Sequence, residues 1–223
     1  MLLGFIFMSV SCTAGKSGSV NTSTPTLVCL GNSLTAGYGA AIPGEDDRDK
    51  SFPAFLQTKI SIPVINAGVS GDTAEEGLSR VKNEVLSQNP GIVIIELGAN
   101  DLFQEIPIEV TQANLQSIIN MINNGSRKIY LAKFYSKSMV RMMLSMLQIS
   151  DYDKQTVLIE QYDAMFSTLA ASKNIELIGD IWAGLSEKHM SDGTHPNAEG
   201  YKIMADNYFK ALKPHLEANG LLK

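Results

Sequence analysis

Short apolar runs alternate with longer amphipathic segments along most of this chain of 223 residues. At the start of the second amphipathic segment, Thr73 and Glu76 have the spacing of a capping box, which predicts a helix start. The apolar runs, which are rich in Val and Ile, predict strands at 26–31, 63–68, 91–98, 128–134 and 175–180. The amphipathic segments predict helices near 52–60, 74–88, 109–123, 154–172 and 197–217.

The composition of the predicted strands indicates how they are arranged. They are apolar on both faces and are separated by helices, which is typical of a parallel sheet that is covered on both sides. The sequence therefore predicts one α/β domain over residues 25–223, a three-layer α/β/α sandwich with about five strands. In such sheets ligands bind outside the carboxyl ends of the strands, so polar residues that follow strands are the candidates for chemistry.

The N-terminal segment, residues 1–24, differs from the rest of the chain. Its first part, MLLGFIFMSVSC, is too short to span a bilayer and resembles a bacterial lipoprotein signal that ends at Cys12, although Ser9 stands where such signals usually carry leucine. The following Gly-, Ser- and Thr-rich stretch is typical of a flexible tether. We expect lipidation at Cys12, a membrane tether and a place in the cell envelope. The protein would be cytoplasmic if the leader is not functional.

Charge and cysteine content exclude several classes of function. The net charge is −5 and the chain has no cluster of Lys and Arg, which argues against nucleic acid as a partner. The only cysteines are Cys12 and Cys29, without the spacing of a metal site or a disulfide framework. Cys29 lies in a strand pattern and is expected to be a buried small side chain.

The polar residues that follow the predicted strands could form a hydrolytic site together. Ser33 follows the first strand, Gly71 the second and Asn100 the third, while Asp192 and His195 lie three residues apart near the C-terminus. Serine needs a base to act as a nucleophile, histidine can be that base, and a carboxylate commonly orients the histidine. Gly and Asn can supply neutral donors for an oxyanion. Each residue alone could equally be a helix cap, a turn residue or a surface residue.

The sequence around these residues resembles one known family. The G-x-S-x-G motif of ordinary α/β-hydrolases is absent around Ser33. Instead, GNSLTAGYG, NAGVSGDTAEEGLSR, ELGAND and DGTHPNAEGY resemble, in order, the four signature blocks of the GDSL, or SGNH, hydrolases, and within them the bacterial thioesterase/lysophospholipase-like arylesterases.

This resemblance implies a flavodoxin-like fold, and it implies neither a metal nor an organic cofactor. It also implies that Ser33 is the nucleophile, that His195 is the base and that Asp192 orients it, with Ser33 N–H, Gly71 N–H and Asn100 as the oxyanion hole. The family usually has Asp before this serine, whereas the chain has Asn32. The neutral amide is expected to keep the turn and leave catalysis in place.

These observations predict a serine hydrolase that cleaves acyl esters or thioesters of small molecules. A carbohydrate O-acetyl esterase, or a catalytically degenerate surface-anchored binding protein, are the alternatives. Residues 134–153 carry four methionines, which either pack in the core or line a site for the acyl chain. If they line such a site, Met142, Met143 and Met146 are the candidate contacts. The sequence does not fix the oligomeric state.

Overall fold

The computed structural model describes residues 25–146 and 152–223, and their five strands form one parallel sheet. The strand order is β2-β1-β3-β4-β5, which is the flavodoxin-like order and confirms the expected α/β/α class. The strands are β1 (Thr26–Gly31), β2 (Val64–Gly68), β3 (Pro90–Glu96), β4 (Lys128–Ala132) and β5 (Glu176–Ile178). Cys12 and the rest of residues 1–24 lie outside the described residues.

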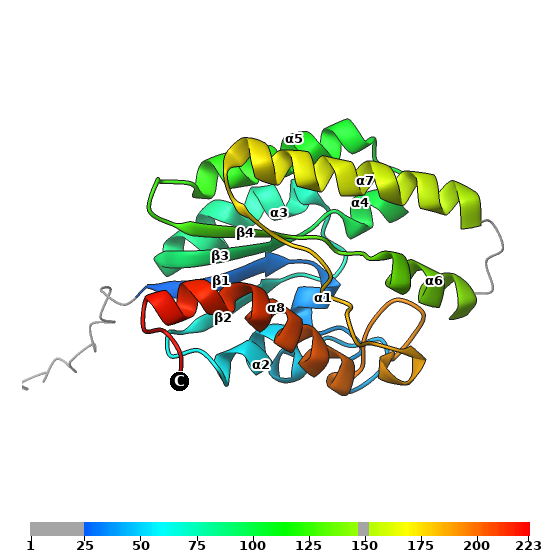
Figure 1. Cartoon of the computed structure of the whole chain (residues 1–223), viewed down its shortest axis with the longest axis horizontal. Helices are drawn as coiled ribbons and strands as arrows, with labels where there is room; N and C mark the ends of the chain where they lie inside the picture. The colour runs from blue at the N-terminus through cyan, green and yellow to red at the C-terminus, as the bar shows by residue number, and fades with distance from the viewer. Residues whose placement is uncertain (1–24, 147–151) are drawn as a thin grey trace, which may run out of the picture.

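Helices cover both faces of the sheet (Figure 1). On one face lie α2 (Phe52–Gln57) and α8 (Ala198–Ala218), and on the other lie α3 (Ala74–Arg80), α5 (Ile108–Ile122) and α7 (Tyr152–Lys173). Three further helices follow the carboxyl ends of strands: α1 (Ser33–Ala36), α4 (Ala99–Phe103) and α6 (Lys137–Met146). The remaining helical turns are η1 (Arg48–Lys50), η2 (Val81–Val85), η3 (Leu86–Gln88) and η4 (Glu187–His189).

The predicted helix over 74–88 is present, but the type of helix changes along it. The capping box is confirmed, because Glu76 N donates to Thr73 Oγ1 and Thr73 N donates to the Glu76 carboxylate at 2.8 Å. Regular α-helix ends at Arg80, a π-helical turn follows, and a final 3₁₀ turn closes the segment. Hydrophobic periodicity cannot resolve this difference, because all three forms keep one face of the segment against the sheet.

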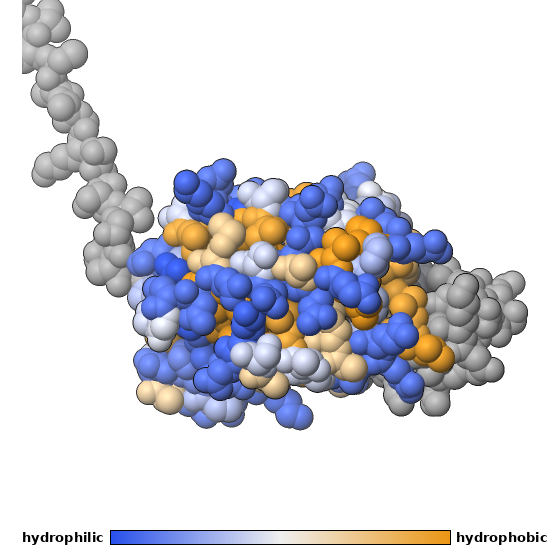
Figure 2. Space-filling view, turned by 90° about the horizontal axis from the view of Figure 1, so that it is seen from above, coloured by the Kyte–Doolittle hydropathy of each residue, from blue (hydrophilic) through white to orange (hydrophobic). Residues whose placement is uncertain are grey.

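The core lies between the sheet and its two helical layers. The strand side chains of β1 are almost fully buried, including Cys29, which is a free thiol as expected. Below the sheet the rings of Phe52 and Tyr208 stack at 4.1 Å and join α2 to α8. The outer face seen in Figure 2 is mostly polar, with apolar groups between the charged side chains. Among the described residues, no helix is both long and apolar enough to cross a membrane.

Candidate active site

The turn after β1 holds Ser33 at the first position of a short helix. Asn32 caps this helix, since its Oδ1 accepts a hydrogen bond from Leu34 N at 3.0 Å. Gly31 has no room for a side chain, because a Cβ there would lie 2.0 Å from Thr35 Oγ1. Ser33 therefore starts a helix, and it also stands at the carboxyl end of β1, between β2 and β3 where the strand order reverses and ligands are expected to bind.

The loop before α8 pairs Asp192 with His195. Asp192 Oδ1 accepts hydrogen bonds from the backbone N–H groups of Thr194 and His195, both at 2.7 Å. Burial alone would raise the pKa of Asp192, but these donors and the His195 ring outweigh it and hold the pKa below its usual value. The loop is closed by Ser191 N, which donates to His195 O at 2.8 Å. Asp192 is thus a fixed, ionised partner for the imidazole.

Ser33, His195 and Asp192 lie in a row. His195 Nε2 is 3.0 Å from Ser33 Oγ, although the two residues are 162 positions apart in the chain. On the other side of the ring, Nδ1 is 2.9 Å from Asp192 Oδ2. The ring of Tyr38 packs against the imidazole with centroids 4.5 Å apart. The convergence that the sequence only suggested is therefore present in the structure.

The three expected oxyanion donors come from three neighbouring strand ends. Asn100 lies on α4, just after β3, and its Nδ2 donates to Asp72 O at 2.9 Å. Gly71 directly precedes Asp72 in the loop after β2 and has φ +92°, a conformation that L side chains rarely adopt. Ser33 and Asn100 line one cavity, whereas Gly71 is not among the residues that line it.

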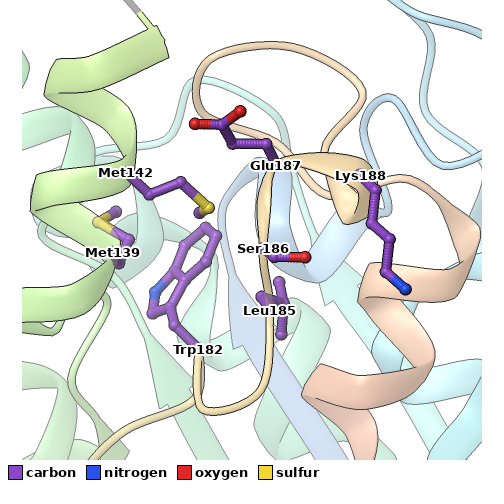
Figure 3. A pocket seen from close by; sticks show the side chains of 7 residues that line it. All are labelled: Met139, Met142, Trp182, Leu185, Ser186, Glu187 and Lys188. Atoms are coloured by element: carbon purple, nitrogen blue, oxygen red, sulfur yellow. The ribbon is translucent and has the colours of Figure 1, made fainter.

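Two adjoining cavities open at this edge of the sheet. The first, of about 350 Å³, is lined by the polar residues Ser33, Asn100 and His195, and its other walls are mainly apolar. Those walls are formed by Leu34, Ala99, Phe103, Phe134, Met139 and Trp182. The second cavity, of about 500 Å³, shares Met139 and Trp182 with the first and adds Met142, Leu185, Ser186, Glu187 and Lys188 (Figure 3).

The three candidate methionines differ in their positions. Met142 lines the second cavity beside the Trp182 ring (Figure 3). Met146 is half-buried against the core and lines neither of these two cavities. The side chain of Met143 lies outside the described residues. Met139, which was not among the candidates, lines both cavities.

A buried carboxyl group lies beneath the turn that carries Ser33. Glu96, the last residue of β3, is fully buried, and its Oε2 accepts from Thr35 Oγ1 at 3.0 Å. Burial raises the pKa of Glu96 to about 8, although donors on Thr35 and Asn32 act in the opposite direction. The carboxyl group thus titrates far above the range of an exposed glutamate.

The sequence did not point to two further residues of the site. Tyr201 of α8 is fully buried and its hydroxyl donates to Tyr38 O at 2.8 Å, which ties α8 to the chain segment just beyond the Ser33 helix. Trp182 donates from Nε1 to Phe134 O at 2.8 Å, which fixes the wall between the cavities. Trp182 follows the last strand, so the strand-end rule that found Asn100 could also have found it. Tyr201 ends the block DGTHPNAEGY, but its place inside a helix pattern indicates no role at the site.

Among residues 25–146 and 152–223, no three His, Cys, Asp or Glu side chains gather in a way that could hold a metal ion.

The fold and the residues at its strand ends define an α/β/α hydrolase of the SGNH type. A sequence model described as the GDSL-like Lipase/Acylhydrolase family matches residues 29–203. The chain belongs to this family, as its four sequence blocks led us to expect, and is an SGNH-type carboxylic ester hydrolase.

Individual relatives and solved structures agree with this assignment. An arylesterase of Vibrio mimicus is 28% identical over 198 residues, which cover 85% of this chain and 89% of the relative. Thioesterase 1/protease 1/lysophospholipase L1 of Escherichia coli K12 is 27% identical over 194 residues, which cover 85% and 84%. The solved structure of a putative lipolytic protein of the G-D-S-L family from Desulfitobacterium hafniense has a TM-score of 0.66 at 28% identity, and the match covers 84% of this chain and 99% of that one.

Proposed function

We propose that the protein hydrolyses acyl esters or thioesters with Ser33 as nucleophile, His195 as general base and Asp192 as the group that orients the imidazole. The observation that carries this proposal is the unbroken row from Ser33 Oγ to His195 Nε2, 3.0 Å apart, and from Nδ1 to Asp192 Oδ2, 2.9 Å apart. Such a row is the arrangement that activates a serine hydroxyl.

In the proposed reaction, Ser33 Oγ attacks the acyl carbonyl carbon while His195 Nε2 takes the hydroxyl proton. The carbonyl oxygen becomes an oxyanion, for which Ser33 N–H, Gly71 N–H and the Asn100 amide are the proposed donors. Collapse of this intermediate expels the alcohol or thiol, which receives the proton from His195. Water then attacks the acyl-enzyme while His195 takes its proton. Collapse of this second intermediate releases the acid, and His195 returns the proton to Ser33 Oγ.

The apolar walls of the first cavity support an acyl group as the substrate portion bound there. Aromatic and thioether side chains from four different segments surround the space beside Ser33. We propose that short acyl chains fill this cavity and that longer chains pass Met139 and Trp182 into the second cavity, where Met142 contacts them. Met143 remains a candidate contact on the sequence pattern alone, whereas Met146 lines neither cavity and is not part of this proposed path. The printed names of the relatives, arylesterase and thioesterase/lysophospholipase, fit such substrates.

Initial rates with p-nitrophenyl esters and acyl-thioesters of two to sixteen carbons test this function. We expect hydrolysis by the wild-type protein and none by Ser33→Ala, while Ser87→Ala, which removes an exposed serine remote from the cavity, keeps the wild-type rate. Substantial hydrolysis by pure Ser33→Ala protein would refute the assignment of the nucleophile. Activity restricted to acetylated sugars would favour the carbohydrate O-acetyl esterase. Failure of Ser33 to react with a fluorophosphonate would favour the non-catalytic binding protein.

The role of Met142 has a matched control on the same helix. Met142→Gln places a polar amide in the second cavity, whereas Met146→Gln changes a methionine that lines neither cavity. We expect Met142→Gln to lower kcat/KM for esters of twelve or more carbons by about tenfold, the scale of a lost apolar contact. Butyrate esters should be unaffected. Equal chain-length profiles for the two variants would remove Met142 from the acyl site.

We further propose that residues 1–24 direct the protein to the cell envelope and that Cys12 carries the lipid. This part rests on the sequence of the segment alone. The mass of protein extracted from membranes should show an acylated Cys12, and a Cys12→Ser variant should lose both the added mass and the membrane association. An unmodified mature protein would refute it.

A further inference from the structure

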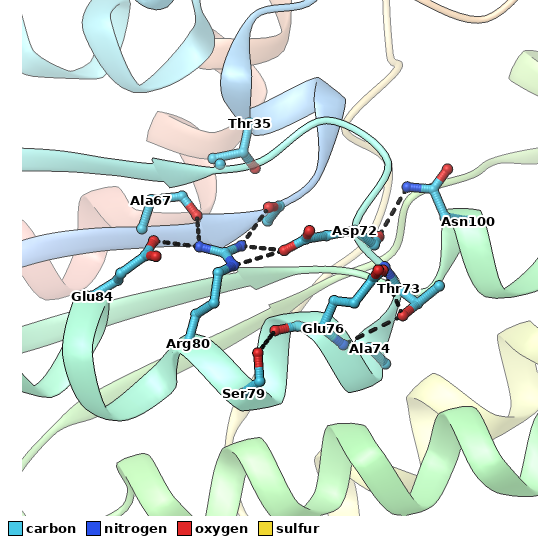
Figure 4. Close-up of polar contacts among 12 residues, drawn as sticks. Thr35, Ala67, Asp72, Thr73, Ala74, Glu76, Ser79, Arg80, Glu84 and Asn100 are labelled. Carbon is cyan, nitrogen blue, oxygen red and sulfur yellow. Dashed lines mark hydrogen bonds and ion pairs between the residues drawn. The ribbon is translucent and has the colours of Figure 1, made fainter.

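Arg80 holds the ends of two strands that lead into the active site. It is the last residue of α3, and its side chain is only 14% exposed. Nη2 donates to Gly31 O at the end of β1 at 3.3 Å, and Nη1 donates to Ala67 O in β2 at 3.1 Å. Figure 4 shows the guanidinium group at the centre of these contacts. The strand before Ser33 and the strand before Gly71 are therefore fastened to one side chain.

The same guanidinium group binds the loop after β2 through Asp72. Nε donates to Asp72 Oδ2 at 2.7 Å, and Nη2 lies 2.6 Å from the same oxygen. The Asp72 side chain is 10% exposed, and burial raises its pKa, while the hydrogen bond and the positive charge of Arg80 act in the opposite direction. A charge pair that is this well shielded from solvent holds its geometry more firmly than an exposed pair.

Asp72 in turn holds Asn100 through its backbone. Asn100 Nδ2 donates to Asp72 O at 2.9 Å, as Figure 4 shows. A side-chain amide has two N–H donors, so the bond to Asp72 fixes the direction of the second one. Asn100 itself lines the cavity that contains Ser33. Gly71 immediately precedes Asp72. The two proposed oxyanion donors, Gly71 N–H and the Asn100 amide, therefore both depend on the position of Asp72.

We propose that Arg80 is a positioning residue for the oxyanion hole, which it aligns with Ser33 through Asp72 and the ends of β1 and β2. The inference rests on the proposed function, because it needs Gly71 and Asn100 to act as oxyanion donors. Arg80 lines neither cavity, so it would act through the groups that it holds. Its planar fork reaches Asp72, Gly31 and Ala67 at once, which the single ammonium group of lysine cannot do.

Arg80→Lys tests this role, and Glu84→Gln is its matched control. Glu84 accepts from Arg80 Nη1 at 2.5 Å, but its side chain is 45% exposed and lies on the opposite side of the guanidinium group from Asp72 (Figure 4). Glu84→Gln therefore leaves in place the contacts of Arg80 with Asp72 and with the two strands. For Arg80→Lys we expect kcat to fall by about 10- to 100-fold, where the upper value corresponds to the loss of one oxyanion donor. KM should stay within about twofold of the wild-type value. Glu84→Gln should keep wild-type kcat.

Two readouts separate positioning from a general loss of structure. A trifluoromethyl ketone forms a tetrahedral adduct with Ser33, so its inhibition constant should rise in Arg80→Lys by the same factor as kcat/KM falls. In an Asn100→Ala background, Arg80→Lys should cost at least about threefold less than in the wild-type protein, because part of what it positions is already gone. Thermal unfolding of each variant shows whether it is folded at the assay temperature.

The outcomes are distinct. Wild-type kcat in folded Arg80→Lys, or an equal effect with and without Asn100, would overturn the inference while leaving the hydrolase assignment in place. Failure of the wild-type protein to hydrolyse any ester would overturn the proposed function and this inference with it. If Arg80→Lys does not fold, Asp72→Asn gives the same test, since it removes the charge that Arg80 binds and keeps the backbone carbonyl for Asn100. Wild-type kcat in that variant would again overturn the role.

Discussion

The buried carboxyl group of Glu96 makes the stability of this protein depend on pH in a way that one substitution should remove. Glu96 is fully buried beneath the Ser33 turn, and burial raises its pKa from the usual 4.5 to about 8. In the unfolded chain the same group loses its proton near its usual pKa. Glu96→Gln replaces it with a neutral amide of similar size that has no proton to lose.

The sign and size of the effect follow from linkage. Between pH 4.5 and about 8 the folded protein keeps the Glu96 proton and the unfolded chain does not, so the free energy of unfolding falls as pH rises. One pH unit corresponds to about 1.4 kcal/mol, so the whole interval is worth about 5 kcal/mol at most. For a chain of this length that is a change of roughly 10–20 °C in Tm. The protonated Glu96 thus contributes its full stabilisation of the folded protein at pH 4.5 and below, and this stabilisation is lost by about pH 8.

Urea unfolding at several pH values between 5 and 9 measures this dependence. We expect the unfolding free energy of Glu96→Gln, taken relative to the wild-type protein, to rise by several kcal/mol from pH 5 to pH 8.5. Glu84→Gln is the control, because it removes a carboxylate that is 45% exposed and should leave the pH dependence unchanged. Parallel curves for Glu96→Gln and the wild-type protein would show that Glu96 is ionised in the folded state at neutral pH, and would refute the argument.

Three further outcomes are expected. Asp192→Asn should lower kcat by about 10³- to 10⁴-fold with little change in KM, because the imidazole loses the carboxylate that orients it, and steady-state rates measure this. Gly68→Ala should destabilise the protein by about 1–3 kcal/mol or more, because the new Cβ would lie 2.3 Å from a backbone nitrogen of α1. Gly179→Ala is the control, since a Cβ there has nothing within 4 Å, and thermal melts should show it to be nearly neutral. Tyr201→Phe should cost about 1 kcal/mol of stability by removing the hydrogen bond to Tyr38 O, which urea titration measures.

The fold could be predicted from the sequence because its strands are short, doubly buried and separated by amphipathic helices. β1 begins and ends at the predicted residues, and the other strands differ by a few residues at their ends. The predicted strand over 91–98 stops at Glu96 because Gly98, with φ +109°, turns the chain into α4. The four-residue helix at Ser33 and the π-helical turn at Val81–Val85 leave no hydrophobic period long enough to detect.

Ser33, His195 and Asp192 could be named as candidates from the sequence for a different reason. Asp192 and His195 are close in the chain, so their pairing is local, and Ser33 directly follows β1, which lies between β2 and β3 in the sheet. Residues that act through tertiary contacts leave no such local mark. Arg80 ends the block NAGVSGDTAEEGLSR, but it has the appearance of an ordinary charged residue at the end of an amphipathic helix, and only the folded chain shows that its side chain turns inward to the strand ends.

The structure also gives a physical reason why Asn at position 32 is compatible with a working site. Asn32 is 1% exposed, and what the turn requires of it is an oxygen that accepts from Leu34 N, which an amide supplies as well as a carboxylate. Its amide group also lowers the cost of ionising the neighbouring Glu96, whereas a carboxylate at position 32 would place two acidic groups in one buried space. Two such groups cannot both ionise cheaply, and the pKa of one of them would rise further. Asn32 therefore keeps the cap and leaves a single buried acid under the nucleophile turn.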